Sequence, residues 1–281
     1  MKILIIGQGY LGSRCHAEWG DSVISNDHIA SIDDVLKILN THEPDVVLNA
    51  AGIVGKPNVD WCESHQMETI QGNTILPIII AEACQKKNIY LLHMGTGCIY
   101  YGYAEDKNGW KESDYANPVA VYTRAKYAAD LVLATMPNIG IARIRMPIDS
   151  IPHPGNLINK LASFSKVIDV VNSVTLVPDM IKVFRALLEQ KASGIFHVTN
   201  PGALKHKEIL ELYEELVDQN HHNEWIQEGD LLKQGLVNKK RSNNILQSEN
   251  LAKFGIAMPE VHESLRVVMS EYARHKTNPA P

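Results

Sequence analysis

The stretch Gly7-Gln8-Gly9-Tyr10-Leu11-Gly12 decides the fold, because it follows the apolar run Lys2–Ile6 and leads into a helical pattern that begins near Leu11. Three glycines at this spacing allow a tight turn, a close approach of a pyrophosphate to the backbone, and close packing of helix on strand. The free N–H groups at the start of the helix also attract anions. We therefore predict that residues 7–12 bind a dinucleotide; a glycine-rich turn without a ligand is the alternative.

Short apolar runs then alternate with helical patterns that begin near Ile32, Trp61 and Tyr122. Continuous apolar runs are typical of parallel strands that are covered on both faces. The pattern predicts an α/β fold with a Rossmann-type, doubly wound parallel sheet and a smaller C-terminal lobe. The further strands expected in this half are Asp21–Ser25, Asp45–Asn49, Ile89–Met94 and Gly140–Arg145.

Prolines at positions 147, 152 and 154 interrupt this alternation after the fifth strand. We predict a dinucleotide-binding domain over residues 1–150 and a mainly substrate-binding lobe over 151–281, with strands from 165–200 returning to the sheet. The polar segment 218–240 is expected to be a loop with short helices. The elements expected here are strands Val167–Val171 and Gly194–Val198 and helices Leu157–Phe164, Pro178–Glu189, Lys207–Leu216 and Val261–Tyr272.

Composition narrows the class of protein. The chain has 281 residues, 45% of them hydrophobic, and a net charge of −5. It therefore lacks the basic excess that would favour nucleic acid or an anionic membrane as a partner. No stretch is long enough to span a bilayer. Its four cysteines are scattered, as in reduced cytoplasmic proteins. We therefore predict a cytoplasmic protein. Trp61, Cys62 and His65 lack a second pair of metal ligands, so we also predict that no metal is bound.

The pair in Tyr122-Thr123-Arg124-Ala125-Lys126 carries the first catalytic prediction. Helical spacing places the phenol and the ammonium one turn apart on one face. A nearby ammonium lowers the pKa of a tyrosine from about 10. Tyr122 is thereby predicted to be a general acid. Tyr127 has no lysine four residues beyond it and is not a candidate.

Thr96 and Cys98 follow the fourth strand, at the edge of the sheet where ligands bind in such folds. The Thr96 hydroxyl is suited to polarise a substrate carbonyl. If the segment stays extended, the thiol points to the same side and could remove a proton from carbon beside a ketone. The alternative for Cys98 is a small buried hydrophobe.

The cofactor type is left open by two residues. Asp27, at the end of the second strand, could bond the ribose 2′-hydroxyl of NADH, whereas Arg14 could meet the 2′-phosphate of NADPH. The small residues of Asn49-Ala50-Ala51-Gly52 suit the passage of a dinucleotide, or form a plain structural turn. We expect NADPH because the predicted chemistry is reductive, with NADH as the alternative.

Together these motifs resemble the extended short-chain dehydrogenases/reductases, within them the dTDP-4-dehydrorhamnose reductase group, and most sharply the plant bifunctional nucleotide-rhamnose 3,5-epimerase/4-reductases. The loop 7–10 differs from the plant sequences and the stretch after the second strand is shorter, so NADPH against NADH stays open. The matching stretches are Asn49–Gly52, Lys56–His65, Thr96–Ile99, Arg143–Ile148, Thr199–Gly202 and Arg241–Asn244.

The resemblance implies reduction of a UDP- or dTDP-linked 4-keto-6-deoxy sugar after inversion at C3 and C5. It implies a polarising Thr96, an acid/base Tyr122 and a supporting Lys126, the latter two also touching the cofactor. The related GDP-fucose synthase has a cysteine at the position of Cys98, which favours the epimerisation base over the hydrophobe. It also implies Lys160 as the second epimerisation acid, with a solvated helix lysine as the alternative.

For the nucleotide diphosphate, the resemblance points to Arg241 together with Asn243 and Asn244. Asn172 is a further predicted substrate contact. A homodimer packed through the helix of Tyr122 is a further family-based expectation. A plain reductase that needs a separate epimerase and a non-catalytic, dinucleotide-binding regulatory subunit are the other two functions considered.

Overall fold

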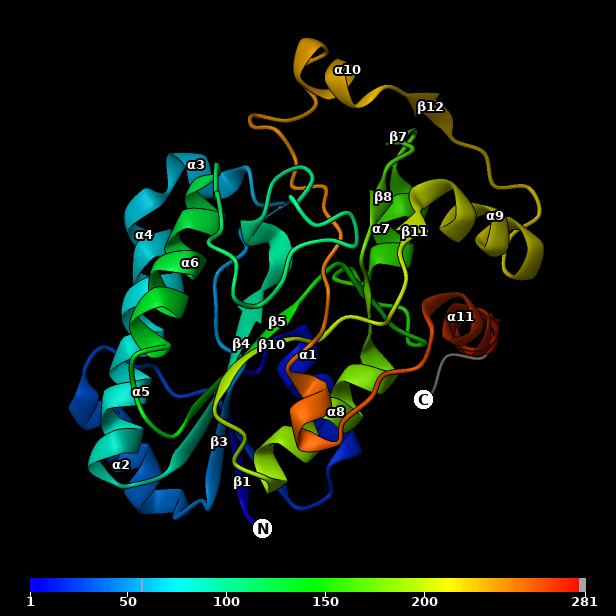
Figure 1. Ribbon diagram of the computed structural model, residues 1–281. Coiled ribbons are helices and arrows are strands. Elements are labelled where there is room, and N and C mark those ends of the chain that lie inside the picture. Colours follow the sequence, from blue (N-terminus) through cyan, green and yellow to red (C-terminus); the bar gives the residue numbers. More distant parts are fainter. Residues whose placement is uncertain (57, 278–281) are drawn as a thin grey trace.

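The computed structural model describes residues 1–56 and 58–277, so Pro57 of the matching stretch Lys56–His65 lies outside the described residues. A six-stranded sheet in the order β10-β5-β4-β3-β1-β2 forms its centre (Figure 1). Every neighbouring pair in this sheet is parallel, which confirms the predicted doubly wound class. Its strands are β1 (Ile3–Ile6), β2 (Ser22–Ser25), β3 (Val46–Asn49), β4 (Tyr90–Thr96), β5 (Ile139–Ile144) and β10 (Gly194–His197).

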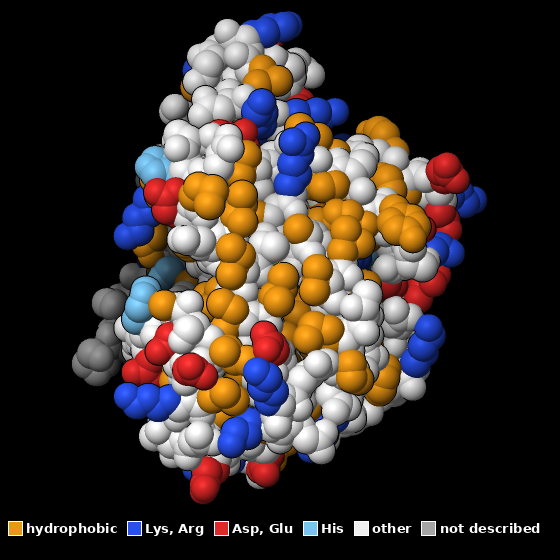
Figure 2. All heavy atoms as spheres, turned by 90° about the vertical axis from the view of Figure 1, so that its left-hand side faces the viewer, with side chains coloured by type: hydrophobic (Ala, Val, Ile, Leu, Met, Phe, Trp, Pro, Cys, Tyr) orange, Lys and Arg blue, Asp and Glu red, His pale blue; other side chains and the backbone are white. Residues whose placement is uncertain are grey.

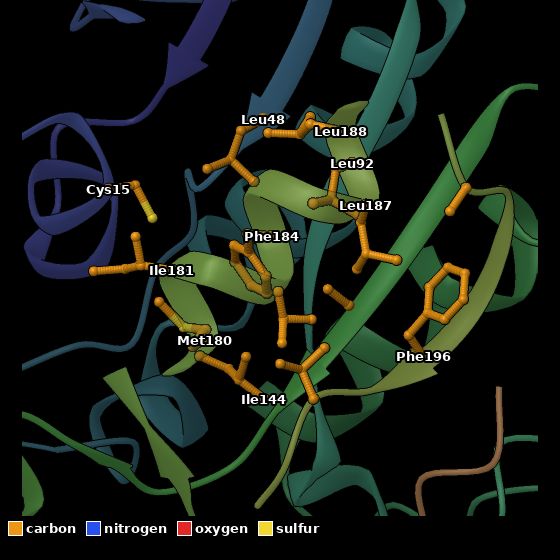
Figure 3. Packing of buried hydrophobic residues seen from close by; sticks show 14 of the residues in the cluster. Cys15, Leu48, Leu92, Ile144, Met180, Ile181, Phe184, Leu187, Leu188 and Phe196 are labelled. Carbon is orange, nitrogen blue, oxygen red and sulfur yellow. The ribbon is translucent and has the colours of Figure 1, made fainter. Parts of the chain in front are cut away.

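Both faces of the sheet are apolar because side chains alternate along each strand. In β1, Ile3 and Ile5 join the core under α1 and α8, whereas Leu4 and Ile6 join the core under α2, α5 and α6. Figure 3 shows Phe184 of α8 packed among the first of these cores. The covering helices are α1 (Tyr10–Glu18) and α8 (Val177–Glu189) on one face, and α2 (Ile32–His42), α5 (Leu76–Lys86) and α6 (Val121–Leu133) on the other.

The helical pattern that begins at Trp61 is interrupted, which the sequence pattern did not predict. α3 (Trp61–Ser64) ends at His65, whose backbone leaves the helical region at φ −125° and ψ 57°. α4 (Gln66–Ile70) then passes into a π-helical turn, η1 (Gln71–Ile75), before α5. Asn73 in this turn accepts from the backbone N–H of Ile53 and donates to its carbonyl, at 3.1 and 2.8 Å. These two hydrogen bonds of Asn73 hold the loop that follows β3.

The second half of the chain returns to the sheet once. Gly194–His197 becomes β10 at its edge, as expected, but the expected strand at 167–171 does not join it: β7 (Lys166–Ile168) pairs with β12 (Glu224–Ile226). β10 occupies the free edge of β5, which removes that position for any other strand. The division at residue 150 stays a prediction.

The lobe beyond the sheet has its own apolar core, formed mainly by α7, α9 and α11. The helices over 157–164, 207–216 and 261–272 thus form close to their expected bounds, and the segment 218–240 contains one short strand and one short helix. Its elements are α7 (Leu157–Ser163), α9 (His206–Leu216), α10 (Glu228–Lys233), η3 (Leu251–Phe254), α11 (Val261–Thr277) and the short ribbons β6 (Pro147–Ile148) with β9 (Thr175–Leu176) and β8 (Val171–Asn172) with β11 (Leu204–Lys205).

A buried ion pair joins α6 to β5 beneath the edge of the sheet. Arg143 Nε lies 2.8 Å from Asp130 Oδ2, and the two side chains are 2% and 1% exposed. Arg143→Met would leave a buried carboxylate without its partner, so we expect a loss of about 3–5 kcal/mol in the free energy of unfolding. Urea unfolding measures it. Arg185→Met, which breaks an exposed pair with Asp21, is the control and should cost about 0–1 kcal/mol.

Candidate active site

The carboxyl ends of the parallel strands bring the predicted site residues to one edge of the sheet. Gly7 follows β1, Ala50 follows β3, and Thr96 ends β4. Arg145 follows β5. Ligands in open α/β sheets bind at this edge.

The glycine loop has the geometry that a pyrophosphate requires. Gly7 adopts φ +109°, and a Cβ there would lie 2.5 Å from the backbone nitrogen of Ala51. A Cβ on Gly12 would lie 2.1 Å from the carbonyl oxygen of Gly7, whereas one on Gly9 would meet nothing within 4 Å. Gly9 also begins α1 without a side-chain cap, so the first N–H groups of the helix remain available. These residues fit a bound dinucleotide phosphate.

Gly12→Ala tests this loop. The added methyl group meets backbone rather than a movable side chain, so we expect a loss of about 1–3 kcal/mol in stability together with weakened dinucleotide binding. Chemical unfolding and fluorescence titration with NADPH measure the two effects. Gly9→Ala should retain stability because its methyl group enters open space, and should weaken only binding. Equal stability of Gly12→Ala and the unmodified protein would contradict this packing.

Beside the loop, the two candidates for recognising the cofactor's ribose differ in how they are held. Arg14 Nε donates to the buried Asp149 at 2.7 Å, and the Tyr10 hydroxyl donates to the same carboxylate at 3.1 Å. Asp27 lies two residues beyond β2, is exposed, and accepts from Ser25 Oγ at 2.7 Å. Arg14 and Tyr10 therefore both donate hydrogen bonds to Asp149, whereas the side chain of Asp27 is exposed to solvent.

Tyr122 and Lys126 lie on α6 as predicted, but their electrostatics differ from the expectation. Burial, followed by the charge of Cys98, raises the pKa of Tyr122, and hydrogen bonding with Thr96 opposes this shift. Lys126 is buried and donates from Nζ to the carbonyl of Met94 at 2.8 Å. Burial lowers its pKa to about 8. The prediction that the lysine lowers the pKa of Tyr122 is thus wrong: the amine is turned toward β4, and the phenol stays protonated.

Cys98 is not part of an extended segment, so the geometric premise of its prediction is also wrong. The chain forms a 3-10 turn, η2 (Gly97–Ile99), in which Thr96 Oγ1 accepts from the backbone N–H of Cys98 at 3.2 Å. The thiol is nevertheless only half-buried, and its Sγ accepts from Arg145 Nη1 at 3.3 Å. It also contributes to the pKa values of Tyr122 and Lys160, which places both groups near it.

Arg145 is the site residue that sequence reasoning missed. It is 1% exposed, and its guanidinium donates to Cys98, to Asn172 Oδ1, and to the carbonyl and hydroxyl of Ser242. Burial lowers its pKa. The charge of Cys98 opposes that shift, so the guanidinium and the sulfur interact directly. The sequence did contain a signal for Arg145: the residue lies at the end of the predicted fifth strand, and that end of the sheet is where ligands bind.

Lys160 lies on α7 and is exposed. Burial lowers its pKa, and the charge of Cys98 opposes that shift. Lys160 of α7 and Cys98 of η2 therefore lie within electrostatic reach of each other. The role of Lys160 as the second epimerisation acid stays a prediction.

The four predicted substrate contacts have different partners. Asn172 is buried and bonds Arg145 and, at 3.2 Å, Asn243. Asn244 is also buried and donates to the carbonyls of residues 97 and 100 at 3.2 and 2.7 Å. Asn172 therefore positions Arg145, and Asn244 holds the backbone on either side of Cys98. Arg241 donates with both terminal nitrogens to Asp60, at 3.1 and 2.7 Å.

Two general findings concern the described residues only. No three metal-ligating side chains gather at one place among residues 1–56 and 58–277. Within the same residues, no helix is both long enough and apolar enough to cross a membrane.

A family model described as the RmlD substrate binding domain matches residues 1–273. The chain belongs to the dTDP-4-dehydrorhamnose reductase family. It is accordingly an enzyme of the short-chain dehydrogenase/reductase type, as the glycine loop and the Tyr122/Lys126 pair predicted. A bifunctional dTDP-4-dehydrorhamnose 3,5-epimerase/reductase of Arabidopsis thaliana is 32% identical over 92% of this chain and 87% of its own length.

Two further relatives extend the comparison. A trifunctional rhamnose-forming enzyme of the same plant, RHM2, is 32% identical over 94% of this chain, which spans only 41% of that protein. The crystal structure of the L780 UDP-rhamnose synthase from Acanthamoeba polyphaga mimivirus superposes with a TM-score of 0.90, at 30% identity, over 96% of this chain and 99% of that one. A dTDP-4-dehydrorhamnose reductase of Bacillus anthracis in complex with NADP shares the fold, with a TM-score of 0.80 at 20% identity over 96% and 98%.

Proposed function

We propose that this reductase is bifunctional: it inverts C3 and C5 of a nucleotide-linked 4-keto-6-deoxy-D-glucose and then reduces C4 to give a nucleotide L-rhamnose, using NAD(P)H. The observation that carries the epimerase half is the Cys98 thiol, half-buried against the buried Arg145 and close to Tyr122. A reductase alone does not need a thiol and a cation at that point. The relatives named above as epimerases and rhamnose synthases support the same assignment.

In the epimerisation, Cys98 as thiolate removes the proton from the carbon beside the ketone. The electrons move to the ketone oxygen, where the hydroxyls of Thr96 and Tyr122 stabilise the enolate. Lys160 then supplies a proton to the opposite face of the same carbon. Cys98 then loses its proton to water and Lys160 regains one from water, which restores the site. The same two proton transfers at the second carbon complete the inversion of C3 and C5, without net oxidation.

In the reduction, the glycine loop and Lys126 would hold the dinucleotide, which would supply the hydride. Tyr122 donates its proton to the C4 oxygen as the carbonyl becomes an alcohol. Burial raises the pKa of Tyr122 in the cofactor-free site, so the phenol there carries the proton that it would donate. Arg241 is suited to the nucleotide diphosphate by its bidentate geometry, with Asp60 as the carboxylate that the diphosphate would displace.

Incubation of the keto-sugar nucleotide with enzyme in D2O, without NAD(P)H, tests the proposal. We expect deuterium at C3 and C5 by mass spectrometry and NMR. Absence of exchange, with NAD(P)H-dependent reduction of a pre-epimerised substrate intact, would identify a plain reductase. Running UDP and dTDP substrates in parallel shows which nucleotide is preferred. Binding of NADPH without turnover of any substrate would instead favour the regulatory subunit.

We also propose that the enzyme is a cytoplasmic homodimer. Its four cysteines are unpaired, as expected in a reducing compartment. Figure 2 shows apolar side chains gathered on the face of the molecule that carries α4 to α6. Light scattering after size exclusion measures the oligomeric state, and Leu131→Glu should yield monomers if this face pairs. The exposed hydrophobic residues of these elements are Met67, Ile75, Leu131 and Val132.

A further inference from the structure

Two buried polar side chains behind the catalytic helix, which have no part in the reaction described above, form a hydrogen-bonded series that ends at Lys126. Asn49 of β3 and His93 of β4 are register partners in the sheet, and both are 0% exposed. Asn49 Nδ2 lies 3.1 Å from His93 Nδ1, and His93 Nε2 lies 3.3 Å from Lys126 Nζ. Buried polar atoms that lie this close need matched donors and acceptors.

One fixed donor sets the direction of each hydrogen bond in the series from Asn49 through His93 to Lys126. The backbone N–H of Ala51 points at Asn49 Oδ1 over 3.0 Å, and a backbone N–H cannot accept. The amide nitrogen of Asn49 therefore faces His93, so His93 Nδ1 must accept. A neutral imidazole that accepts at Nδ1 carries its proton on Nε2. That N–H then points at Lys126 Nζ.

An ammonium group has three donors and no acceptor, so a protonated Lys126 would oppose the Nε2–H of His93. A neutral amine gives each hydrogen bond of the series one donor and one acceptor. Its lone pair accepts from His93, and one of its N–H groups donates to the carbonyl of Met94, 2.8 Å away. We propose that Asn49 and His93 are positioning residues that hold Lys126 as a neutral amine in the cofactor-free enzyme. The inference rests on the proposed function only in assigning Lys126 to the cofactor.

The charged groups around α6 are consistent with this assignment. Asp130, one turn beyond Lys126, favours the ammonium form, but Arg143 of β5 engages its carboxylate at 2.8 Å. Glu63 of α3 accepts from the backbone at the start of α6 and not from Lys126. Burial lowers the pKa of Lys126 to about 8, so the opposed N–H of His93 must lower it further for the amine to be neutral at pH 7. Burial also lowers the pKa of His93 well below its usual value.

The tautomer of His93 provides the direct test. Long-range ¹H–¹⁵N NMR of histidine-labelled, cofactor-free protein distinguishes the two neutral tautomers, and His93→Gln assigns the signals. We expect the Nε2–H tautomer throughout neutral pH. An Nδ1–H tautomer or an imidazolium would overturn the proposal. The measurement uses no sugar substrate, so its outcome is separate from the success or failure of the proposed reaction.

Asn49→Asp is designed to reverse the donor and acceptor roles in the hydrogen bonds between residue 49, His93 and Lys126. Its carboxylate accepts from both Ala51 and His93, which moves the His93 proton to Nδ1 and lets Nε2 accept from a charged Lys126. We expect the titration midpoint of Lys126, followed by ¹³C NMR of its ε-carbon, to rise by about one pH unit or more. The sign follows because the substitution favours the protonated form. A lowered or unmoved midpoint would overturn the proposal.

The new carboxylate also acts through space, so the same substitution is made in a His93→Phe background. This double-mutant cycle separates the direct charge effect from the effect relayed by the imidazole. We expect a clearly larger shift when His93 is present. Equal shifts in the two backgrounds would show that His93 relays nothing. If Asn49→Asp does not fold, the tautomer measured in the unmodified protein still decides.

Discussion

Tyr122→Phe is expected to lower the rate of sugar reduction by roughly 10²–10⁴-fold, the usual contribution of a positioned general acid. The substitution removes one oxygen atom and retains the ring that packs at the start of α6. NADPH binding and the free energy of unfolding should therefore change little. Stopped-flow oxidation of NADPH with a pre-epimerised substrate measures the rate, and fluorescence titration measures binding.

The same helix offers a matched control in Tyr127→Phe. The Tyr127 hydroxyl accepts from the backbone N–H of Ala116 at 3.1 Å, a structural contact away from the predicted site. Its loss should cost about 0.5–1.5 kcal/mol in stability and leave the reduction rate near that of the unmodified enzyme. Similar rates for the two phenylalanine variants would remove Tyr122 from its role as proton donor.

The fold could be predicted from the sequence because local pattern and tertiary structure agree where the chain is most regular. The alternation in β1 supplies both cores, and Gly7 and Gly12 occupy positions where a Cβ would collide with backbone. The interruption at His65 could not be predicted, because the helical periodicity continues through it. At the break the His65 ring stacks on Trp61, with ring centroids 3.8 Å apart, and its Nδ1 lies 3.0 Å from the Trp61 carbonyl oxygen.

The site was predicted in its residue types rather than in its geometry. The spacing of Tyr122 and Lys126 indicated one helix face, but no spacing rule shows that the amine turns to Met94 on β4. Likewise, Arg145 acquires its place beside Cys98 from contacts with Asn172 and Ser242, which lie far along the chain. Asn172 was predicted to bind substrate, whereas here it holds the arginine. Short-range patterns contain no information on such long-range partners.

Cys98→Ala should abolish the exchange of substrate hydrogens for deuterium while leaving reduction of a pre-epimerised substrate close to its normal rate. The thiol is the proposed base, and loss of a positioned base lowers a proton-transfer rate by roughly 10²–10⁴-fold. Reduction depends on Tyr122 and the cofactor instead. The substitution removes one weak acceptor from Arg145, whose guanidinium keeps its contacts with Ser242 and Asn172. The site should therefore retain its shape.

Cys84→Ala is the control for the loss of a thiol as such. Cys84 is 1% exposed on α5, and burial raises its pKa to about 12, so it cannot act as a base at neutral pH. Its removal should leave both exchange and reduction intact. Cys98→Ser adds a second comparison, because a hydroxyl of similar size is far less acidic than a thiol and should also lose exchange. Undiminished deuterium incorporation in both Cys98 variants would assign the inversion to another base, and equal loss of both activities would assign Cys98 to the shared binding site.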